Sequence, residues 1–261
     1  MLSSGLLDFL PLGGLFGIII AMVLLSIEVG YRLGRFRRRR SAEEKEAPVG
    51  EIIAATLGLL AFILAFTFGM AASRFDERRK IVVEEANSIG TTYLRAGLLP
   101  DGRGPSVRKL LRDYVDARLE FLRTKDVENL LLHSGKLHRD LWREAEAVGV
   151  QHPDSIVVGL FIQALNETID IHSRRVLVGL ESRLPKVLWT TLYLVTILTM
   201  AGVGYHEGLA KSRRSWAIVV LILTFAATMT LVADLDRPQE GLVTVSQQAM
   251  IDLRKAMNDT P

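Results

Sequence analysis

The fold is decided by residues 50–100, which read GEIIAATLGLLAFILAFTFGMAASRFDERRKIVVEEANSIGTTYLRAGLLP. Residues 52–73 carry no charge, and as a helix they are long enough to cross ~30 Å of hydrocarbon. From Phe75 onward the apolar residues recur at intervals of three and four, the spacing of one helix face. We therefore predict one helix that leaves the membrane without a break and ends at LLPDGRGP, residues 98–105.

Three further apolar runs match this one in length, over residues 9–29, 187–205 and 216–233. A buried helix of a large soluble core is the alternative for any one run, but four runs ending in charged clusters favour membrane spans. We predict an all-α integral membrane protein with four transmembrane helices in two hairpins and a helical soluble domain between spans two and three. The predicted segments are a first transmembrane helix (1–34), a basic loop (35–50), a second transmembrane helix (51–73), a helical extramembrane domain (74–185), a third transmembrane helix (186–205), a short basic loop (206–215), a fourth transmembrane helix (216–234) and a C-terminal amphipathic segment (235–261).

Composition narrows the function. The chain lacks cysteine, which excludes disulfides and cysteine-based metal or redox sites. A net charge of +3 gives no reason to expect nucleic acid as a partner. The combination of 49% hydrophobic and 23% charged residues, segregated into alternating apolar and charged blocks, points to the lipid bilayer. Six arginines follow the first apolar run and no basic segment precedes it, so we interpret this run as a retained anchor rather than a signal peptide.

Basic residues also predict the orientation. Short loops rich in Lys and Arg stay in the cytoplasm. Such a loop follows the first span, and another, between spans three and four, contains Lys211, Arg213 and Arg214. This rule places both termini and the central domain on the extracytoplasmic side of the cell inner (plasma) membrane. Basic residues beside the central domain, such as Arg78 and Lys186, favour the reverse, but the rule weights short loops above domains.

The central domain is predicted to be helical throughout. Its helices are expected from Phe75 to the break at 98–105, from about Ser106, over 127–147, and from a cap at Asp154 or Ser155 to the junction at Pro185. Its 18 Lys and Arg nearly balance 17 Asp and Glu, which is typical of a solvated helical surface. The amphipathic C-terminal segment is expected either to lie on the membrane surface or to dock on this domain.

The second span carries two stripes of functional interest when its residues are laid out at about 100° each. The first stripe has only small residues, which let helix backbones approach closely in lipid, so we predict that it packs on another helix. It comprises Ala54, Gly58, Ala61, Ala65, Gly69 and Ala72. The second stripe changes from aromatic to polar on leaving the membrane, and comprises Phe62, Phe66, Ser73, Glu77, Lys80, Glu84, Thr91 and Arg95.

The second stripe has two interpretations. As a pore lining, Phe62 and Phe66 form an apolar neck that gates by dewetting, and the polar residues form a wetted vestibule. Because one copy of a four-span chain encloses no channel, this interpretation requires a symmetric homo-oligomer around the second span. Alternatively, the two phenylalanines face lipid or a partner helix, and the charges are ordinary surface.

No catalytic, cofactor or metal site is expected, and the protein is not expected to be an enzyme. His133, His138, His152 and His172 are scattered, without the spacing of a metal site. Glu84 and Glu85 are adjacent and point to different helix faces, which argues against a carboxylate dyad. The chain also has no nucleophile elbow, Walker loop or dinucleotide fingerprint. No ionisable residue lies at mid-span, which disfavours a coupled transporter.

Residues 64–100, LAFTFGMAASRFDERRKIVVEEANSIGTTYLRAGLLP, resemble the signature block of the bestrophin-like family of bacterial and plant membrane proteins, also described as the domain of unknown function DUF4239. The stretches RDYVDARL (112–119) and DLDRPQEG (234–241) fit the same family. The resemblance implies a likeness to bestrophins, which are pentameric anion channels whose second membrane helix lines the pore. By this resemblance Phe62 and Phe66 are neck residues, joined by Ile63 or Leu59.

Two departures accompany the resemblance. Bestrophins keep their termini and soluble domain in the cytoplasm, the reverse of the orientation predicted here. The Asp-rich cluster that bestrophins use for calcium is missing, so calcium gating is not expected. The leading hypothesis is a homo-oligomeric channel for small ions, with anions favoured. The alternative is a membrane-anchored sensory or scaffolding protein whose helical domain binds a ligand or partner.

Overall fold

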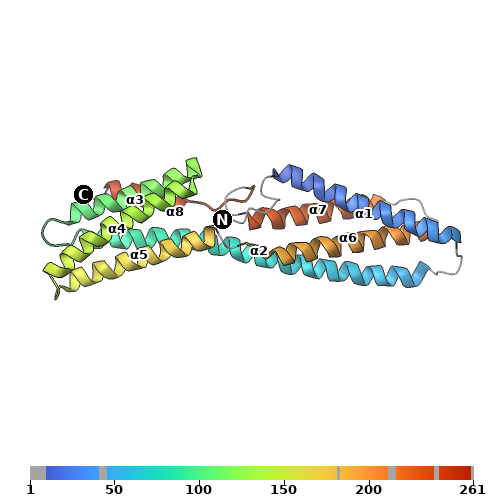
Figure 1. Cartoon of the computed structure of the whole chain (residues 1–261), viewed down its shortest axis with the longest axis horizontal. Helices are drawn as coiled ribbons and strands as arrows, with labels where there is room; N and C mark the ends of the chain where they lie inside the picture. Colours follow the sequence, from blue (N-terminus) through green and yellow to red (C-terminus); the bar gives the residue numbers. More distant parts are fainter. Residues whose placement is uncertain (1–9, 41–45, 181–182, 211–215, 238–240, 260–261) are drawn as a thin grey trace. The chain divides into compact units, whose positions relative to one another are not determined.

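The computed structural model describes residues 10–40, 46–180, 183–210, 216–237 and 241–259, and these contain helices and no strand (Figure 1). The helices are α1 (Leu12–Arg40), α2 (Glu46–Ala96), α3 (Gly104–Thr124), α4 (Val127–Gln151), α5 (Ile156–Leu180), α6 (Lys186–Leu209), α7 (Trp216–Asp236) and α8 (Gln248–Asp259). Four of them, α1, α2, α6 and α7, are long and apolar enough to cross a membrane, which confirms the predicted spans. Lys211, Arg213 and Arg214 lie outside the described residues.

The prediction of one unbroken helix from the second span into the next domain is confirmed by α2, which has 51 residues. It ends where the sequence predicts. Asp101 and Gly102 both adopt positive φ, at 58° and 65°, in the turn that follows Pro100. The next helix begins at Gly104, with Pro105 in its first turn, where a missing backbone N–H costs no hydrogen bond.

Several helices are longer than predicted, since α2 begins at Glu46, α6 ends at Leu209 and α7 ends at Asp236. α1 continues into the expected loop as far as Arg40, because arginine is a good helix former and a basic last turn suits the negative end of the helix dipole. α4 was expected to stop at residue 147 but runs to Gln151, since Val148 is fully buried and holds the last turn against the core. At the start of α5, Ser155 accepts a hydrogen bond from the Val158 N–H at 3.4 Å, as expected of a cap.

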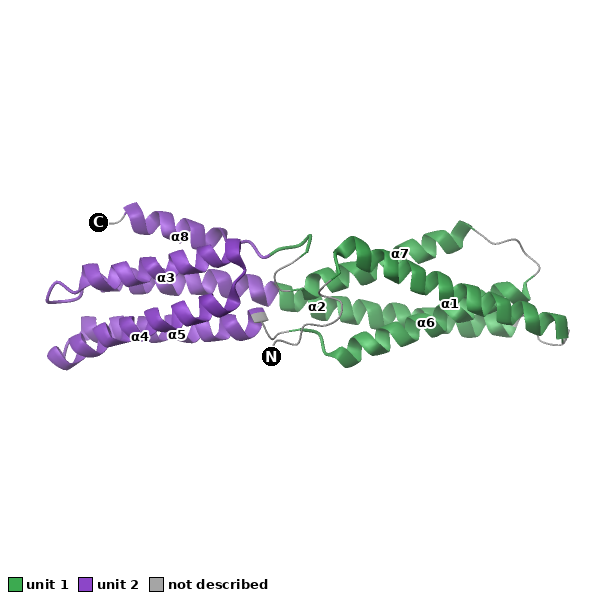
Figure 2. Cartoon of the chain, turned by 45° about the horizontal axis from the view of Figure 1, so that its top comes forward, with its two compact units in different colours: residues 1–75, 182–244 green, residues 76–181, 245–261 purple. Residues whose placement is uncertain are grey.

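The chain forms two compact units (Figure 2). Unit 1 comprises residues 1–75 and 182–244, with α1, α6, α7 and the membrane part of α2. Glycines bring α1 and α6 into backbone contact. A Cβ atom on Gly30 or Gly34 would collide with the carbonyl of Ala201 or Tyr205, and one on Gly204 with the carbonyl of Ile27. Small residues that allow such close approach are a common basis of helix association in lipid.

Unit 2 comprises residues 76–181 and 245–261, with the rest of α2 together with α3, α4, α5 and α8. Its core includes Tyr93, Tyr114 and Phe161. The amphipathic C-terminal segment, whose position the sequence left open, forms α8 and docks on this unit. Met250 and Met257 are buried in the unit 2 core, and the Tyr93 hydroxyl donates to the Met257 carbonyl at 3.0 Å.

Candidate functional site

The predicted neck residues lie on the uncovered side of α2. Phe62 and Phe66 are 69% and 60% exposed within the chain. The buried side of the same stretch carries Leu60, Thr67 and Ala71, roughly 140° around the helix from the two phenylalanines. The phenylalanine rings are therefore available to lipid or to another protein chain, and they do not belong to the core of unit 1.

The small-residue stripe is also uncovered from Ala54 to Gly69. A Cβ atom added to Gly58 or Gly69 would meet nothing within 4 Å. Only 17% of the most apolar window of α2 is buried, against 28% in each of the other three spans. Of this stripe, Ala72 packs against the unit 1 core, and the packing predicted for Gly58 and Gly69 stays a prediction about contacts with another molecule.

The predicted vestibule residues continue along this side of α2 into unit 2. Ser73, Glu77 and Thr91 are exposed. The other three make contacts within the chain: Lys80 pairs with Asp76 at 2.7 Å, Glu84 with Arg174 at 3.4 Å, and Arg95 donates to the Leu160 carbonyl at 2.6 Å. The hydrogen bond that Lys80 donates to Asp76 raises the pKa of Lys80. The stripe thus presents both signs of charge at the surface.

Unit 2 contains a buried polar cluster that the sequence analysis missed. Its centre is Glu85, which has no exposed surface. The Tyr114 hydroxyl donates to Glu85 Oε1 at 2.6 Å, Arg118 Nη2 donates to Oε2 at 3.1 Å, and Arg175 Nη1 also donates to Oε2. Burial raises the pKa of Glu85, but the two guanidinium groups and the tyrosine outweigh burial and bring the pKa to about 2. Glu85 is therefore a buried carboxylate held ionised by its partners.

Two histidines complete this cluster. The Tyr114 hydroxyl lies 2.9 Å from His172 Nδ1, and the His138 ring centroid lies 4.9 Å from that of Tyr114 and 4.6 Å from that of His172. Because the tyrosine proton is directed to Glu85, His172 Nδ1 carries the hydrogen that Tyr114 accepts. Burial lowers the pKa of His138 to about 4 and that of His172 to about 3, so both rings are neutral at pH 7.

The cluster joins α2, α3, α4 and α5 of unit 2. Glu85 lies on α2, Tyr114 and Arg118 on α3, His138 on α4, and His172 and Arg175 on α5. Arg175 Nη2 also donates to Gln247 Oε1 at 2.7 Å, which reaches the segment just before α8. Spacing offered a partial signal, since Tyr114 and Arg118 are four residues apart and therefore share a helix face. Which carboxylate they meet depends on the tertiary packing.

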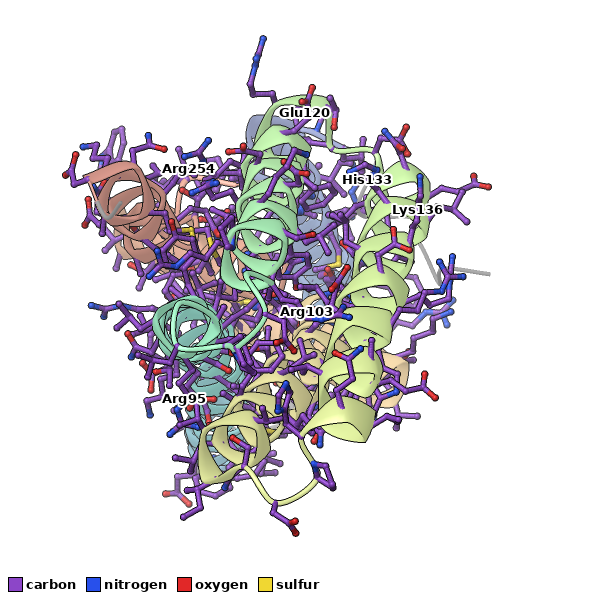
Figure 3. All side chains as sticks on the ribbon, turned by 90° about the vertical axis from the view of Figure 1, so that its left-hand side faces the viewer. Arg95, Arg103, Glu120, His133, Lys136 and Arg254 are labelled. Atoms are coloured by element: carbon purple, nitrogen blue, oxygen red, sulfur yellow. The ribbon has the colours of Figure 1, made fainter. Side chains whose placement is uncertain are left out.

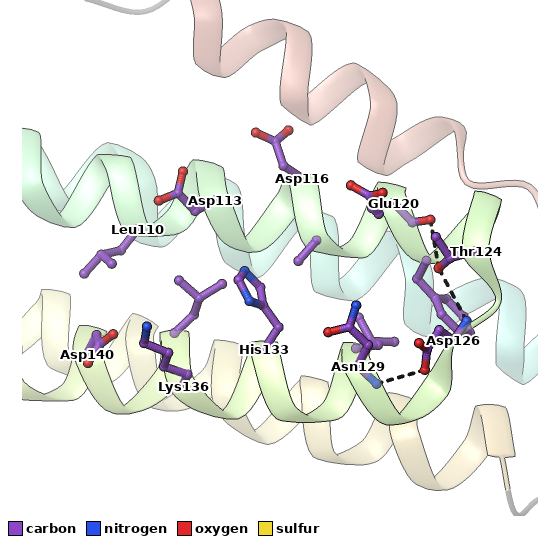
Figure 4. A pocket seen from close by; sticks show the side chains of 14 residues that line it. Leu110, Asp113, Asp116, Glu120, Thr124, Asp126, Asn129, His133, Lys136 and Asp140 are labelled. Carbon is purple, nitrogen blue, oxygen red and sulfur yellow. Dashed lines mark hydrogen bonds between the residues drawn. The ribbon is translucent and has the colours of Figure 1, made fainter.

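A groove of about 510 Å³ lies between α3 and α4 (Figure 4). Acidic side chains line the groove, together with His133 and Lys136. Glu120, His133 and Lys136 are labelled on these two helices in the end-on view of Figure 3. Several carboxylates already have partners: Asp116 binds Arg254 at 2.6 Å, and Asp113 binds Lys109 at 2.8 Å. Among the described residues, no group of three or more His, Asp or Glu side chains is arranged to hold a metal ion.

These features define the class of the protein as a multi-pass helical membrane protein with an attached helical unit. A family model described as the Bestrophin-like domain matches residues 17–250, so the chain belongs to the bestrophin-like family. This match does not confirm the DUF4239 designation. No curated protein shows significant similarity to the chain.

Solved structures share the fold. A crystal structure of a membrane protein superposes with a TM-score of 0.68 at 16% identity, covering 92% of this chain and 97% of that one. A bacterial bestrophin homologue from Klebsiella pneumoniae gives a TM-score of 0.63 at 17% identity over 94% of this chain and 96% of that one. A variant of that homologue gives 0.66 at 17% identity over 93% and 96%. At these identities the likeness establishes the fold alone.

Proposed function

We propose that the protein is a homo-oligomeric membrane channel for small ions, with anions favoured, lined by α2. Membership of the bestrophin-like family supports a channel, and the resemblance to bestrophins favours a pentamer. The observation that carries the proposal is the uncovered side of α2. It combines exposed Phe62 and Phe66 with an open stripe of small residues, and it faces away from the chain's own core.

This combination suits an oligomer better than a lipid-facing surface. A helix surrounded by lipid gains nothing from a row of small residues, whereas a neighbouring helix packs closely against one. If the small-residue stripe packs against the next copy, Phe62 and Phe66, centred roughly 80° further around the helix, face the symmetry axis. Two aromatic rings one turn apart then form an apolar constriction, and the charged residues beyond it form a wetted entrance.

Orientation belongs to the same proposal. The exposed arginines at the end of α1 support an orientation with that end at the cytoplasmic face of the inner membrane. Unit 2 then lies on the extracytoplasmic side, where the charged residues of α2 would meet entering ions.

The test is flux of chloride, and then of potassium, through liposomes containing the wild-type protein, Phe66→Ala or Phe68→Ala. Phe68 is the matched control because it lies on the same helix and in the same span but on another face. We expect flux in the wild type, or flux that appears only with Phe66→Ala, since removing a neck ring widens the constriction. Chloride flux above potassium flux supports anion preference. A stable monomer in detergent, or silence of all three folded proteins, contradicts the channel.

One observation favours the alternative of a membrane-anchored sensor or scaffold: unit 2 carries a groove large enough for a small ligand. A sensor predicts that the same Phe66→Ala change alters only packing. Silence in the flux assay, with folded oligomer present, therefore favours this alternative.

A further inference from the structure

Three buried polar groups on α3 and α4 have hydrogen-bonding atoms that no described residue satisfies. Arg118 Nε, Ser134 Oγ and His138 Nε2 have no hydrogen-bond partner among the described residues. Arg118 is 5% exposed, Ser134 is fully buried and His138 is 9% exposed, so bulk solvent does not satisfy these atoms. Each unsatisfied buried polar atom destabilises the folded state, and three on adjacent turns call for a ligand.

The three groups occupy adjacent turns of two packed helices. The rings of Tyr114 and His138 lie 4.9 Å apart, which fixes the register of antiparallel α3 and α4. Arg118 follows Tyr114 by one turn on α3, and Ser134 precedes His138 by one turn on α4. Antiparallel packing in this register places Arg118 opposite Ser134, beside His138.

The local charge identifies the ligand class. Glu85 supplies one negative charge, whereas Arg118 and Arg175 supply two positive charges. Tyr114 and the two histidines that face them are neutral at pH 7, because burial raises the tyrosine pKa and lowers the histidine pKa values. The cluster therefore carries a surplus of one positive charge in a region shielded from water, where uncompensated charge is costly.

We propose that unit 2 holds a buried halide site, occupied by chloride, between α3 and α4. Its donors are the Arg118 Nε–H, the Ser134 hydroxyl and the His138 Nε2–H. A halide accepts several hydrogen bonds at once and supplies the single negative charge that the cluster lacks. A water molecule would accept hydrogen bonds from these donors, but it would not neutralise the surplus positive charge of the cluster. The site lies outside the α2 surface assigned to the pore and does not depend on ion conduction.

The test is thermal unfolding of the full-length protein in detergent at pH 7.5, with chloride exchanged for gluconate at constant ionic strength. A ligand that binds only the folded state stabilises it by mass action, so we expect chloride to raise the apparent Tm saturably, by about 4 °C or more. Bromide should replace chloride and give an anomalous diffraction peak between α3 and α4.

Ser134→Ala separates this site from any other chloride site. In gluconate the variant should be as stable as the wild type or more so, because it deletes an unsatisfied buried hydroxyl. In chloride it should lose most of the Tm rise. Ser173→Ala, at an exposed serine of α5, is the matched control and should keep the full rise.

Equal Tm values of the wild type in chloride and gluconate overturn the proposal, as does a bromide peak elsewhere with none at this position. A chloride response that Ser134→Ala leaves intact also overturns it, because the anion then binds at another place, such as the pore. If Ser134→Ala does not fold, the wild-type anion response and the bromide peak decide the question together.

Discussion

Within the membrane, α2 buries Leu60, Thr67 and Ala71 on the side that, beyond residue 75, carries Glu85 and Thr92. In the span, the Thr67 hydroxyl donates to the Ile63 carbonyl of its own helix at 2.7 Å. In unit 2, the Thr92 hydroxyl likewise donates to a carbonyl of its own helix, that of Ser88, at 2.9 Å, but it also lies 2.9 Å from the Thr168 hydroxyl on α5. The hydroxyl on this helix face is thus satisfied within the helix in the span, and both within the helix and across helices in unit 2.

The two units are stabilised differently because lipid surrounds unit 1 and water surrounds unit 2. Lipid gives no hydrophobic drive for helices to associate, so unit 1 relies on close backbone packing at Gly30, Gly34 and Gly204. Unit 2 buries apolar side chains away from water, and this stabilisation offsets the cost of an ionised cluster at its centre. The stability of unit 2 should therefore depend on the charges of the cluster, whereas the stability of unit 1 should depend on the small side-chain volume at the glycine contacts.

Breaking the cluster should have the largest effect. Glu85→Ala leaves Arg118 and Arg175 buried together without their carboxylate, so we expect the free energy of unfolding of unit 2 to fall by roughly 3–5 kcal/mol. The measurement is denaturant unfolding of the detergent-solubilised protein, followed by Trp142 fluorescence in a background with Trp189→Phe and Trp216→Phe. Glu84→Ala, at the exposed neighbouring residue, should change stability by less than about 0.5 kcal/mol. Equal losses from both substitutions would contradict a central role for Glu85.

Acid should act on unit 2 in the same direction. Unfolded histidine binds a proton below about pH 6.5, but His138 and His172 in the folded protein bind one only near pH 4 and 3. The unfolded state therefore takes up more protons in this window, and stability falls as pH drops from about 6.5 toward 3. Glu85, with its pKa lowered to about 2, adds a further loss between about pH 4.5 and 2.

The measurement is the Trp142 unfolding transition at a series of pH values. Protonation of unfolded His138 accounts for a stability loss on the order of 3 kcal/mol between pH 6.5 and 4. His138→Gln removes this group, so it should make the decline in stability over this pH range shallower. His133→Gln, at an exposed residue of α4, should leave the decline unchanged. A pH profile that neither substitution alters would show that the cluster does not bury neutral His138.

Adding volume should affect unit 1 and leave unit 2 intact. Gly204→Ala places a methyl group against the Ile27 carbonyl, so α1 and α6 must separate, at a cost of about 1–3 kcal/mol. Unfolding followed by Trp189 fluorescence, with Trp142 and Trp216 replaced by Phe, measures this loss. Gly17→Ala is the matched control, because a Cβ there meets nothing within 4 Å. If both substitutions behave alike, close backbone contact does not stabilise unit 1.

The smallest effect is expected at the edge of unit 2. Arg254 on α8 binds both carboxylate oxygens of Asp116, at 2.6 and 3.0 Å, but this pair is partly exposed. Arg254→Ala should therefore cost less than about 1 kcal/mol and loosen α8, seen as faster amide hydrogen exchange there. Lys255→Ala, at an exposed neighbour, is the control. A loss as large as that of Glu85→Ala would mean that α8 is integral to the core of unit 2.

Hydropathy and the spacing of apolar residues alone predicted the helices of this protein. Uncharged runs of the length of a bilayer determined the spans, since no ionisable residue lies at mid-span. Periodic apolar residues and the break near Pro100 gave α2 its length and end. The amphipathic pattern of Met250 and Met257 identified α8 as a helix. These features are local, so a single sequence contains them.

Tertiary structure alone decided which residues meet. Glu84 and Glu85 are neighbours of the same type, yet Glu84 pairs with Arg174 at the surface, whereas Glu85 is buried between Arg118 of α3 and Arg175 of α5. His138 and His172 are far apart in the chain, and packing brings their rings together. α8 docks on unit 2 because the core there has room for its two methionines. Such contacts join segments remote in sequence, and periodicity contains no information about their partners.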